Sequence, residues 1–217
     1  MNPFPQFEEL KANETFRFRC RSCGVCCRNV KMTVMVESLD LFRIARHYNL
    51  EMTEAAERFT EAATVGWGAP ILLMKATPEG NCIFHKSSRC EIQAVKPRTC
   101  RLYPLSMGPD DEDAKNFIIL KTSERQFHYT GKEHIAGEWV ASNMSGEDYA
   151  YITTEYRLLR ELGRILKRIP REKEADVLKQ MLLCRFFMLE TSESFMPQYV
   201  RNMARLKLTL EQMTKES

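Results

Sequence analysis

Apolar and polar residues alternate over residues 16–20, in which two phenylalanines and Cys20 are separated by arginines. A period of two is typical of a short, half-buried strand. The sequence therefore predicts a strand that runs into a turn bearing the first cysteines. Two further apolar runs, residues 71–75 and 117–120, also have the composition of strands, so we expect a small sheet.

Helical spacing begins after Ser38, where apolar residues recur every three or four positions as far as Tyr48. We expect Ser38 to be the N-cap of this helix and Asn49 to help end it. A second helix is predicted to start after Thr53 and to carry an apolar face as far as Ala63. Both helices are expected to pack against the core.

Beyond Gly146 the apolar spacing becomes almost wholly helical. It predicts three helices with prolines between them, at residues 147–169, 171–189 and 198–213. Their apolar stripes are typical of packing faces rather than of a cofactor site.

The order of these elements predicts an α+β fold class, with a small cysteine-rich metal-binding core of short strands followed by an α-helical C-terminal extension. The length of 217 residues allows such an arrangement. We divide the chain into an N-terminal arm (residues 1–15), a cysteine-cluster metal-binding domain (16–146) and a helical extension (147–217).

Composition and charge narrow the class of protein. With 44% hydrophobic and 28% charged residues the chain has ordinary globular values, which exclude a disordered or low-complexity chain. A net charge of +3 is too small to favour a nucleic-acid partner. No apolar run approaches the roughly 18 residues that a membrane-spanning helix needs, and the first residues lack a basic and apolar leader. We therefore expect a cytoplasmic protein with neither a nucleic-acid nor a membrane partner.

Cysteine is the unusual feature of the composition. Of the 8 cysteines, 7 lie between residues 20 and 100, in the pattern Cys-x2-Cys-Gly-x-Cys-Cys followed by Cys-x7-Cys-x9-Cys. In a reducing compartment clustered cysteines are more often metal ligands or catalytic thiols than disulfides. The predicted metal ligands are Cys20, Cys23, Cys26, Cys27, Cys82, Cys90 and Cys100. Cys184 lies in an apolar helical stretch and is predicted to be a buried structural thiol.

The cysteine spacing admits both iron and zinc. Steps of three in the first cysteine group have the rhythm of ferredoxin-type loops around a 4Fe-4S cluster, whereas the hairpin-like pair Cys82 and Cys90 is equally natural for Zn²⁺. Side chains of adjacent residues such as Cys26 and Cys27 usually diverge, which indicates two metal centres or one polynuclear centre. We favour an iron-sulfur cluster narrowly over zinc.

Seven thiolates are one short of two four-ligand sites, so an eighth ligand, a bridging thiolate or an open coordination position is required if all seven bind. His85 is a candidate because it follows Cys82 at a Cys-x2-His spacing, although a hairpin would also allow it to be exposed. A thiolate-rich centre carries net negative charge. Arg98 and Arg101, which flank Cys100, are therefore predicted to be cofactor-binding cations.

Four short motifs in this region resemble those of one family. The strings FRCRSCGVCC, GNCIF, CEI and RTCRLYPL, within about residues 16–107, resemble the CxxCxxCC cysteine-cluster family, also called the YkgJ family, in sequence and in spacing. The resemblance implies a zinc- or iron-chelating domain. One branch, flagellin lysine N-methylase, further implies an iron-sulfur cluster, S-adenosylmethionine and a protein substrate. Whether the chain is an enzyme is left open between a protein-lysine methyltransferase and a structural zinc module without catalysis.

Carried over position by position, the resemblance implies that the seven clustered cysteines are the chelating set, with Pro97, Arg98 and Arg101 as flanking motif positions. Many relatives carry a further cysteine after the strand that follows the Tyr-Pro-Leu segment, in a neighbourhood where this chain has His128. The resemblance therefore implies either that His128 replaces the missing thiolate as a metal ligand or that the position is without a ligand.

Overall fold

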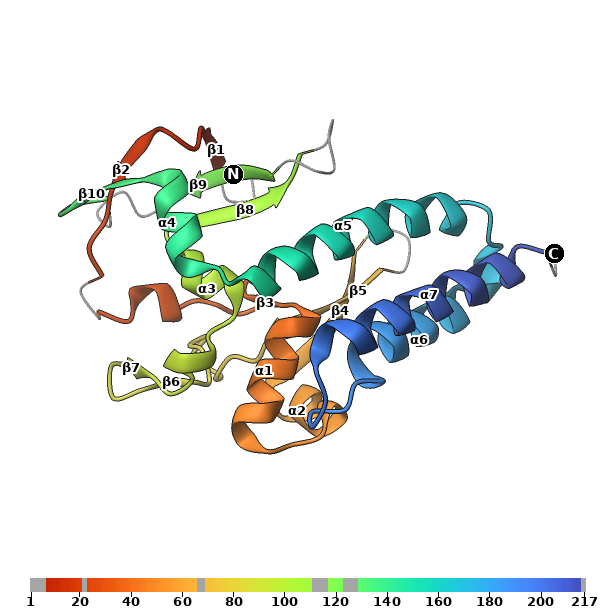
Figure 1. Cartoon of the computed structure of the whole chain (residues 1–217). Helices are drawn as coiled ribbons and strands as arrows, with labels where there is room; N and C mark the ends of the chain where they lie inside the picture. The colour runs from red at the N-terminus through yellow and green to blue at the C-terminus, as the bar shows by residue number, and fades with distance from the viewer. Residues whose placement is uncertain (1–6, 21–22, 66–68, 111–116, 123–128, 216–217) are drawn as a thin grey trace.

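The structure is a computed structural model that describes residues 7–20, 23–65, 69–110, 117–122 and 129–215 (Figure 1). Within these residues short antiparallel strands and helices are mixed in the first part of the chain, and helices follow one another in the C-terminal part. This arrangement confirms the predicted α+β class and the helical C-terminal region.

Ten short strands lie in the described part of the chain: β1 (Phe7–Leu10), β2 (Thr15–Arg17), β3 (Met35–Val36), β4 (Thr60–Val65), β5 (Ala69–Met74), β6 (His85–Lys86), β7 (Arg89–Cys90), β8 (Leu105–Pro109), β9 (Phe117–Thr122) and β10 (Glu133–Ile135). They pair antiparallel in four small sheets, with the orders β1-β9-β8, β10-β2, β3-β5-β4 and β6-β7. No single large sheet organises these residues, and the core lies between small sheets and helices.

The predicted strands are found where the pattern put them. Residues 71–75 overlap β5, and residues 117–120 lie within β9. The strand predicted at residues 16–20 is β2, which ends at Arg17 because its pairing with β10 ends there. Part of the segment predicted as an arm is β1, which pairs with β9 and buries Leu10.

Seven α-helices lie in the same described residues: α1 (Ser38–Tyr48), α2 (Met52–Phe59), α3 (Arg98–Leu102), α4 (Ala136–Asn143), α5 (Gly146–Leu166), α6 (Glu174–Leu182) and α7 (Phe195–Met213). Short 3-10 turns occur at Val25–Cys27, Gln93–Val95 and Arg171–Lys173, and a π-helical turn, Leu183–Phe187, follows α6. The three C-terminal helices are the three that the sequence predicts, with boundaries shifted by a few residues.

The N-terminus of α1 differs from the prediction by one residue. Its N-cap is Glu37, so the prediction of Ser38 as the cap is wrong. The Glu37 N–H donates to Asp40 Oδ2 at 3.3 Å and the Ser38 N–H donates to the Tyr151 hydroxyl, which satisfies these backbone donors without the serine hydroxyl. Asn49 ends the helix in the left-handed conformation, with φ 54°, as predicted.

The second predicted helix is wrong beyond Phe59, where α2 ends and β4 begins. The Thr60 hydroxyl donates to the Ala56 carbonyl at 2.8 Å, and its backbone is extended with φ −128°. The backbone groups of residues 60–65 then pair along the whole of β5. Pairing with a distant strand decides the conformation here, since the alanines of this segment suit a helix equally well.

The C-terminal helices lie alongside one another and form the elongated end of the molecule, away from the β6-β7 hairpin (Figure 1). Tyr151 of α5 packs against Phe195 and Tyr199 of α7, with ring centroids 5.6 and 5.2 Å away. Glu155 of α5 is buried between Arg185, at 2.6 Å, and the Tyr199 hydroxyl. Among the residues that the structure describes, no helix has the length and apolar character that crossing a membrane requires.

Candidate metal centre

The first cysteine group lies on an irregular loop that ends in the Val25–Cys27 turn. Gly24 opens this turn in the left-handed conformation, with φ 69°, and accepts a backbone hydrogen bond from Cys27 at 2.9 Å. The Cys26 and Cys27 sulfur atoms lie 3.9 Å apart. The expectation that these adjacent side chains diverge is wrong here, because the backbone forms a tight 3-10 turn rather than an extended strand. The two thiols therefore lie within hydrogen-bond reach of each other.

The second cysteine group is bonded to this loop through the backbone. The Cys82 N–H donates to the Cys27 carbonyl at 2.8 Å, and the Val30 N–H donates to the Gly80 carbonyl at 2.8 Å. Cys82 precedes the β6-β7 hairpin, and Cys90 ends β7, directly opposite His85. The fold thus brings together two loops that are more than 50 residues apart in sequence.

Cys100 lies on α3, and this helix brings its thiol close to the other two cysteine groups. The carboxylate of Asp40 in α1 accepts the N–H of Arg98, the first residue of α3, at 3.0 Å. At the other end of the helix, the Leu102 carbonyl accepts a hydrogen bond from the Trp139 indole at 2.9 Å. The middle of α3, which carries Cys100, is held in position by contacts at both of its ends.

Neighbouring thiols raise the pKa of Cys27, Cys82, Cys90 and Cys100, and Cys26 is one of those neighbours each time. The pKa of Cys27 is raised by its hydrogen bond with Cys26 above all, then by burial and by the charges of Cys26, Cys82 and Cys100. The pKa of Cys100 is raised to about 12, by burial first and then by neighbours that include Cys82, Cys90 and Cys26. The structure therefore brings together five of the predicted ligands, which are Cys26, Cys27, Cys82, Cys90 and Cys100.

Backbone donors also reach the sulfur atoms of the second group. Burial raises the pKa of both Cys82 and Cys90, while backbone hydrogen bonds oppose this effect, from Phe84 and His85 to Cys82 and from Ile92 to Cys90. N–H groups that point at sulfur stabilise a thiolate. The hairpin is therefore built to hold thiolates once a cation offsets their burial and mutual repulsion.

The other predicted ligands are placed differently. Cys20 and Cys23 are exposed. His128 lies outside the described residues. Among the residues that are described, no three His, Cys, Asp or Glu side chains already stand in positions that would hold one ion together.

Cys184 is separate from the cysteine group. It lies in the π-helical turn after α6, is buried in the hydrophobic core, and burial raises its pKa. These features agree with its prediction as a structural thiol.

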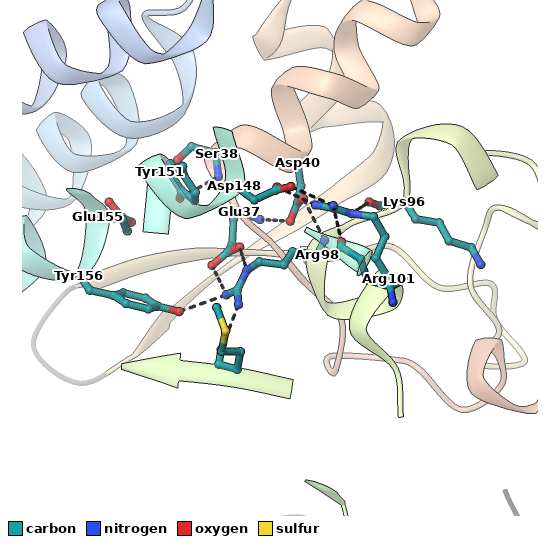
Figure 2. A network of polar contacts seen from close by, with 12 residues as sticks. Glu37, Ser38, Asp40, Lys96, Arg98, Arg101, Asp148, Tyr151, Glu155 and Tyr156 are labelled. Atoms are coloured by element: carbon teal, nitrogen blue, oxygen red, sulfur yellow. Dashed lines mark hydrogen bonds and ion pairs between the residues drawn. The ribbon is translucent and has the colours of Figure 1, made fainter. Parts of the chain in front are cut away.

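Arg98 is the first residue of α3, and its buried guanidinium contacts protein groups (Figure 2). It forms two hydrogen bonds with the Glu37 carboxylate at 2.7 Å each, and donates to the Met107 carbonyl and the Tyr156 hydroxyl. Burial would lower the pKa of Arg98, but Glu37 outweighs this effect and raises it. These contacts position α3, and a direct contact of Arg98 with a cofactor stays a prediction.

Arg101 is held in the same network on the other side of α3 (Figure 2). Its guanidinium forms a two-point ion pair with Asp148 of α5, at 2.7 and 3.0 Å, and donates to the Lys96 and Asn143 carbonyls. Arg43 of α1 binds the same carboxylate at 2.6 Å. Asp148 of α5 thereby connects α1 to α3, the helix that carries Cys100. Cofactor binding by Arg101 likewise stays a prediction.

The acidic partners in this network are the functional residues that sequence reasoning missed. Glu37, Asp40 and Asp148 lie 61, 58 and 47 residues from their arginine partners. Asp40 and Asp148 are the third residues of their helices, where an acidic side chain is commonly a capping group. That position signals a cap but gives no sign of the distant arginine.

With this geometry in view, comparison with known proteins gives one match. A family model named CxxCxxCC and described as a "putative zinc- or iron-chelating domain" matches residues 19–130, more than half of the chain. The chain belongs to this family. Its matched region contains all seven clustered cysteines, the β6-β7 hairpin and α3. A search of curated proteins and of solved structures finds no match.

The donor set fits the metals that the family description names. Thiolates are soft ligands that select zinc and iron-sulfur clusters over Mg²⁺ or Ca²⁺. Five thiols in one region, two of them supplied with backbone N–H donors, provide such ligands without other protein groups. This CxxCxxCC-family chain is thus a metal-binding cysteine-cluster protein, and which metal it holds is a separate question.

Proposed function

We propose that the converging thiols hold one polynuclear metal centre, with an iron-sulfur cluster as the first candidate and zinc as the alternative. The observation that carries the proposal is the convergence of five thiols from three separate segments. A single tetrahedral ion takes four ligands. Five neighbouring thiols exceed that number, and the Cys26 and Cys27 sulfur atoms, 3.9 Å apart, suit a shared centre.

We expect Cys20 and Cys23 to join the same centre when metal binds. They stand on the same loop as Cys26 and are exposed, so they are accessible to an ion bound by the other thiols. The short spacing means that little chain entropy is lost when they close on it. We therefore expect the loop to take up its final conformation only with metal bound, as is usual for small metal sites.

Anaerobic purification followed by metal and acid-labile sulfide analysis tests the proposal. We expect iron and sulfide in comparable amounts, with the broad visible absorption of an iron-sulfur protein. Colourless protein with stoichiometric zinc and no sulfide would replace the cluster by zinc. Protein that holds neither metal after anaerobic reconstitution would contradict the centre itself.

Methyl transfer to a protein lysine remains the enzymatic hypothesis, and it derives from the resemblance to flagellin lysine N-methylase. It requires binding of S-adenosylmethionine. Isothermal titration of the metal-loaded protein with S-adenosylmethionine is the test, and saturable heat would support the hypothesis. Absence of heat would favour a structural metal module that supports contact with another protein.

A cytoplasmic location is part of the same proposal. All the cysteines that the structure describes are free thiols, and clustered free thiols persist in reducing compartments.

A further inference from the structure

His85 is a histidine that the fold brings into the cysteine group. It opens β6, three residues after Cys82, and is paired directly with Cys90 across the hairpin. Directly opposite residues of an antiparallel pair point to the same face. The His85 imidazole and the Cys90 thiol therefore share one face of the hairpin.

The backbone around His85 has the hydrogen bonds of a metal-binding turn. The His85 N–H donates to the Cys82 carbonyl at 2.9 Å, and the N–H groups of Phe84 and His85 also reach the Cys82 sulfur. In a Cys-x2-Cys metal turn the residue three positions after the first cysteine supplies the second ligand. His85 occupies that position here.

The imidazole has a buried nitrogen with no hydrogen-bond partner in the described part of the chain, namely Nε2. A buried polar atom without a partner costs about 1–3 kcal/mol. Neutral imidazole nitrogen is a common ligand of zinc and is also found in some iron-sulfur centres. A metal ion at Nε2 would remove this cost.

The first cysteine loop leaves room for the ring. A Cβ on Gly24 would stand 2.3 Å from Nε2 and 2.6 Å from Cε1 of His85, so any other residue at this position would overlap with the imidazole. Gly24 lies between Cys23 and Cys26. The unpaired nitrogen is therefore directed at the turn that presents the first group of thiols.

From these four observations we propose that His85 Nε2 is a direct ligand of the metal centre, together with thiolates of the five-cysteine group. The proposal rests on the proposed function, because it assigns one more donor to the same site. It also adds an eighth donor to the seven clustered cysteines. Because the imidazole is neutral, this donor adds no negative charge to the centre.

Nitrogen-resolved NMR of the full-length chain, titrated with Zn²⁺ as a diamagnetic probe, tests this assignment. The sequence has only 4 histidines, so the imidazole region of a ¹⁵N-labelled sample is simple to assign. We expect Zn²⁺ to move the His85 Nε2 signal and to displace any proton on it, while His47, an exposed residue of α1, is unaffected. His85→Gln should weaken Zn²⁺ binding at least about tenfold, and His85→Cys should restore it to within about tenfold of wild type.

The possible outcomes separate the two proposals. A zinc-loaded protein in which His85 Nε2 keeps its proton would overturn ligation and leave His85 a hydrogen-bond donor to sulfur. Loss of the zinc-dependent imidazole signal in His128→Gln, with its persistence in His85→Gln, would assign the ligand to His128 instead. Failure of the wild-type chain to bind Zn²⁺, iron or a cluster would overturn the metal centre and the ligand together. His47→Gln is the matched control and should bind Zn²⁺ like wild type.

Discussion

Arg98 and Glu37 form a two-point ion pair at the start of the helix that carries Cys100, with Nε to Oε2 and Nη2 to Oε1 at 2.7 Å each. Their side chains are only 5% and 8% exposed. The pair connects the start of α3 to the N-cap of α1, 61 residues earlier. Because both charges are buried, each requires the other, and the position of the helix that carries Cys100 depends on their contact.

Arg98→Met should lower the free energy of unfolding by about 3–5 kcal/mol, because it leaves the Glu37 charge buried without its partner. The double variant with Glu37→Gln should lose less than the sum of the two single losses, since the two groups act as a unit. Urea denaturation of the metal-loaded protein measures both quantities. The control is Arg17→Met, whose ion pair with Glu133 is exposed on both sides (66% and 58%) and should cost under about 1 kcal/mol. Equal losses for Arg98→Met and Arg17→Met would contradict the structural role of the buried pair.

Asp148→Asn should destabilise the protein at neutral pH and progressively less in acid. Burial would raise the pKa of Asp148, but hydrogen bonds from Arg101 and Ser145 outweigh it and lower the pKa in the folded state. A group with a lowered folded-state pKa stabilises the fold above its unfolded pKa of about 3.9, and this contribution is lost as the pH falls toward the folded-state pKa.

The difference in unfolding free energy between wild type and Asp148→Asn should thus be constant from about pH 5 to 8 and shrink below about pH 4. Urea titrations at several pH values measure it. Glu193→Gln, which removes an exposed carboxylate paired loosely with Arg201, should show little difference at any pH. A difference for Asp148→Asn that grows as the pH falls would have the wrong sign for this account.

Gly24→Ala should reduce metal affinity more than Gly80→Ala does. Both glycines have positive φ, 69° and 81°, so both alanines introduce backbone strain. Only at Gly24 does the added Cβ overlap with His85, because the nearest atoms to a Cβ at Gly80 are 3.8 Å away. A double-mutant cycle isolates the clash: Zn²⁺ affinity is measured for wild type, Gly24→Ala, His85→Ala and the double variant. Gly24→Ala should reduce the affinity less in the His85→Ala background than in wild type, because the overlapping ring is then absent. Identical effects of the two glycine substitutions would show that backbone strain alone matters.

Cys100→Ser should lower both metal content and stability, whereas Cys184→Ser should leave metal content unchanged. Cys100 is a member of the five-thiol group, and Cys184 is buried among the C-terminal helices. Metal analysis after anaerobic purification, together with thermal denaturation, compares them. Cys20→Ser is also expected to lose metal, which would place this exposed thiol in the loaded centre. Equal metal loss in Cys100→Ser and Cys184→Ser would contradict the assignment of the site.

Local pattern was enough to predict much of the fold. The α+β class, the strands at β5 and β9 and the three C-terminal helices follow from apolar spacing and proline positions, which are properties of neighbouring residues. The segment after Phe59 was predicted wrongly because its conformation depends on pairing with β5. Tertiary pairing overrides local propensity at such positions.

The sequence likewise predicts only part of the candidate site. Cysteine spacing indicates the candidate ligands, since short spacings restrict where thiols can lie, and the fold brings five of these seven candidates together. The carboxylates that hold α3 were missed, because Glu37 and Asp148 find their arginines only in the folded chain. The short distance between the Cys26 and Cys27 sulfur atoms was not predicted, because it depends on a 3-10 turn for which the sequence has no clear signal.

The central claim is that thiols from three separate segments bind one metal centre. X-ray absorption at the metal edge of the anaerobically purified, full-length protein tests it most directly, because it counts the sulfur neighbours of the bound metal and measures their distance. The account predicts a first shell dominated by sulfur at about 2.3 Å. A metal surrounded only by oxygen and nitrogen neighbours would contradict it.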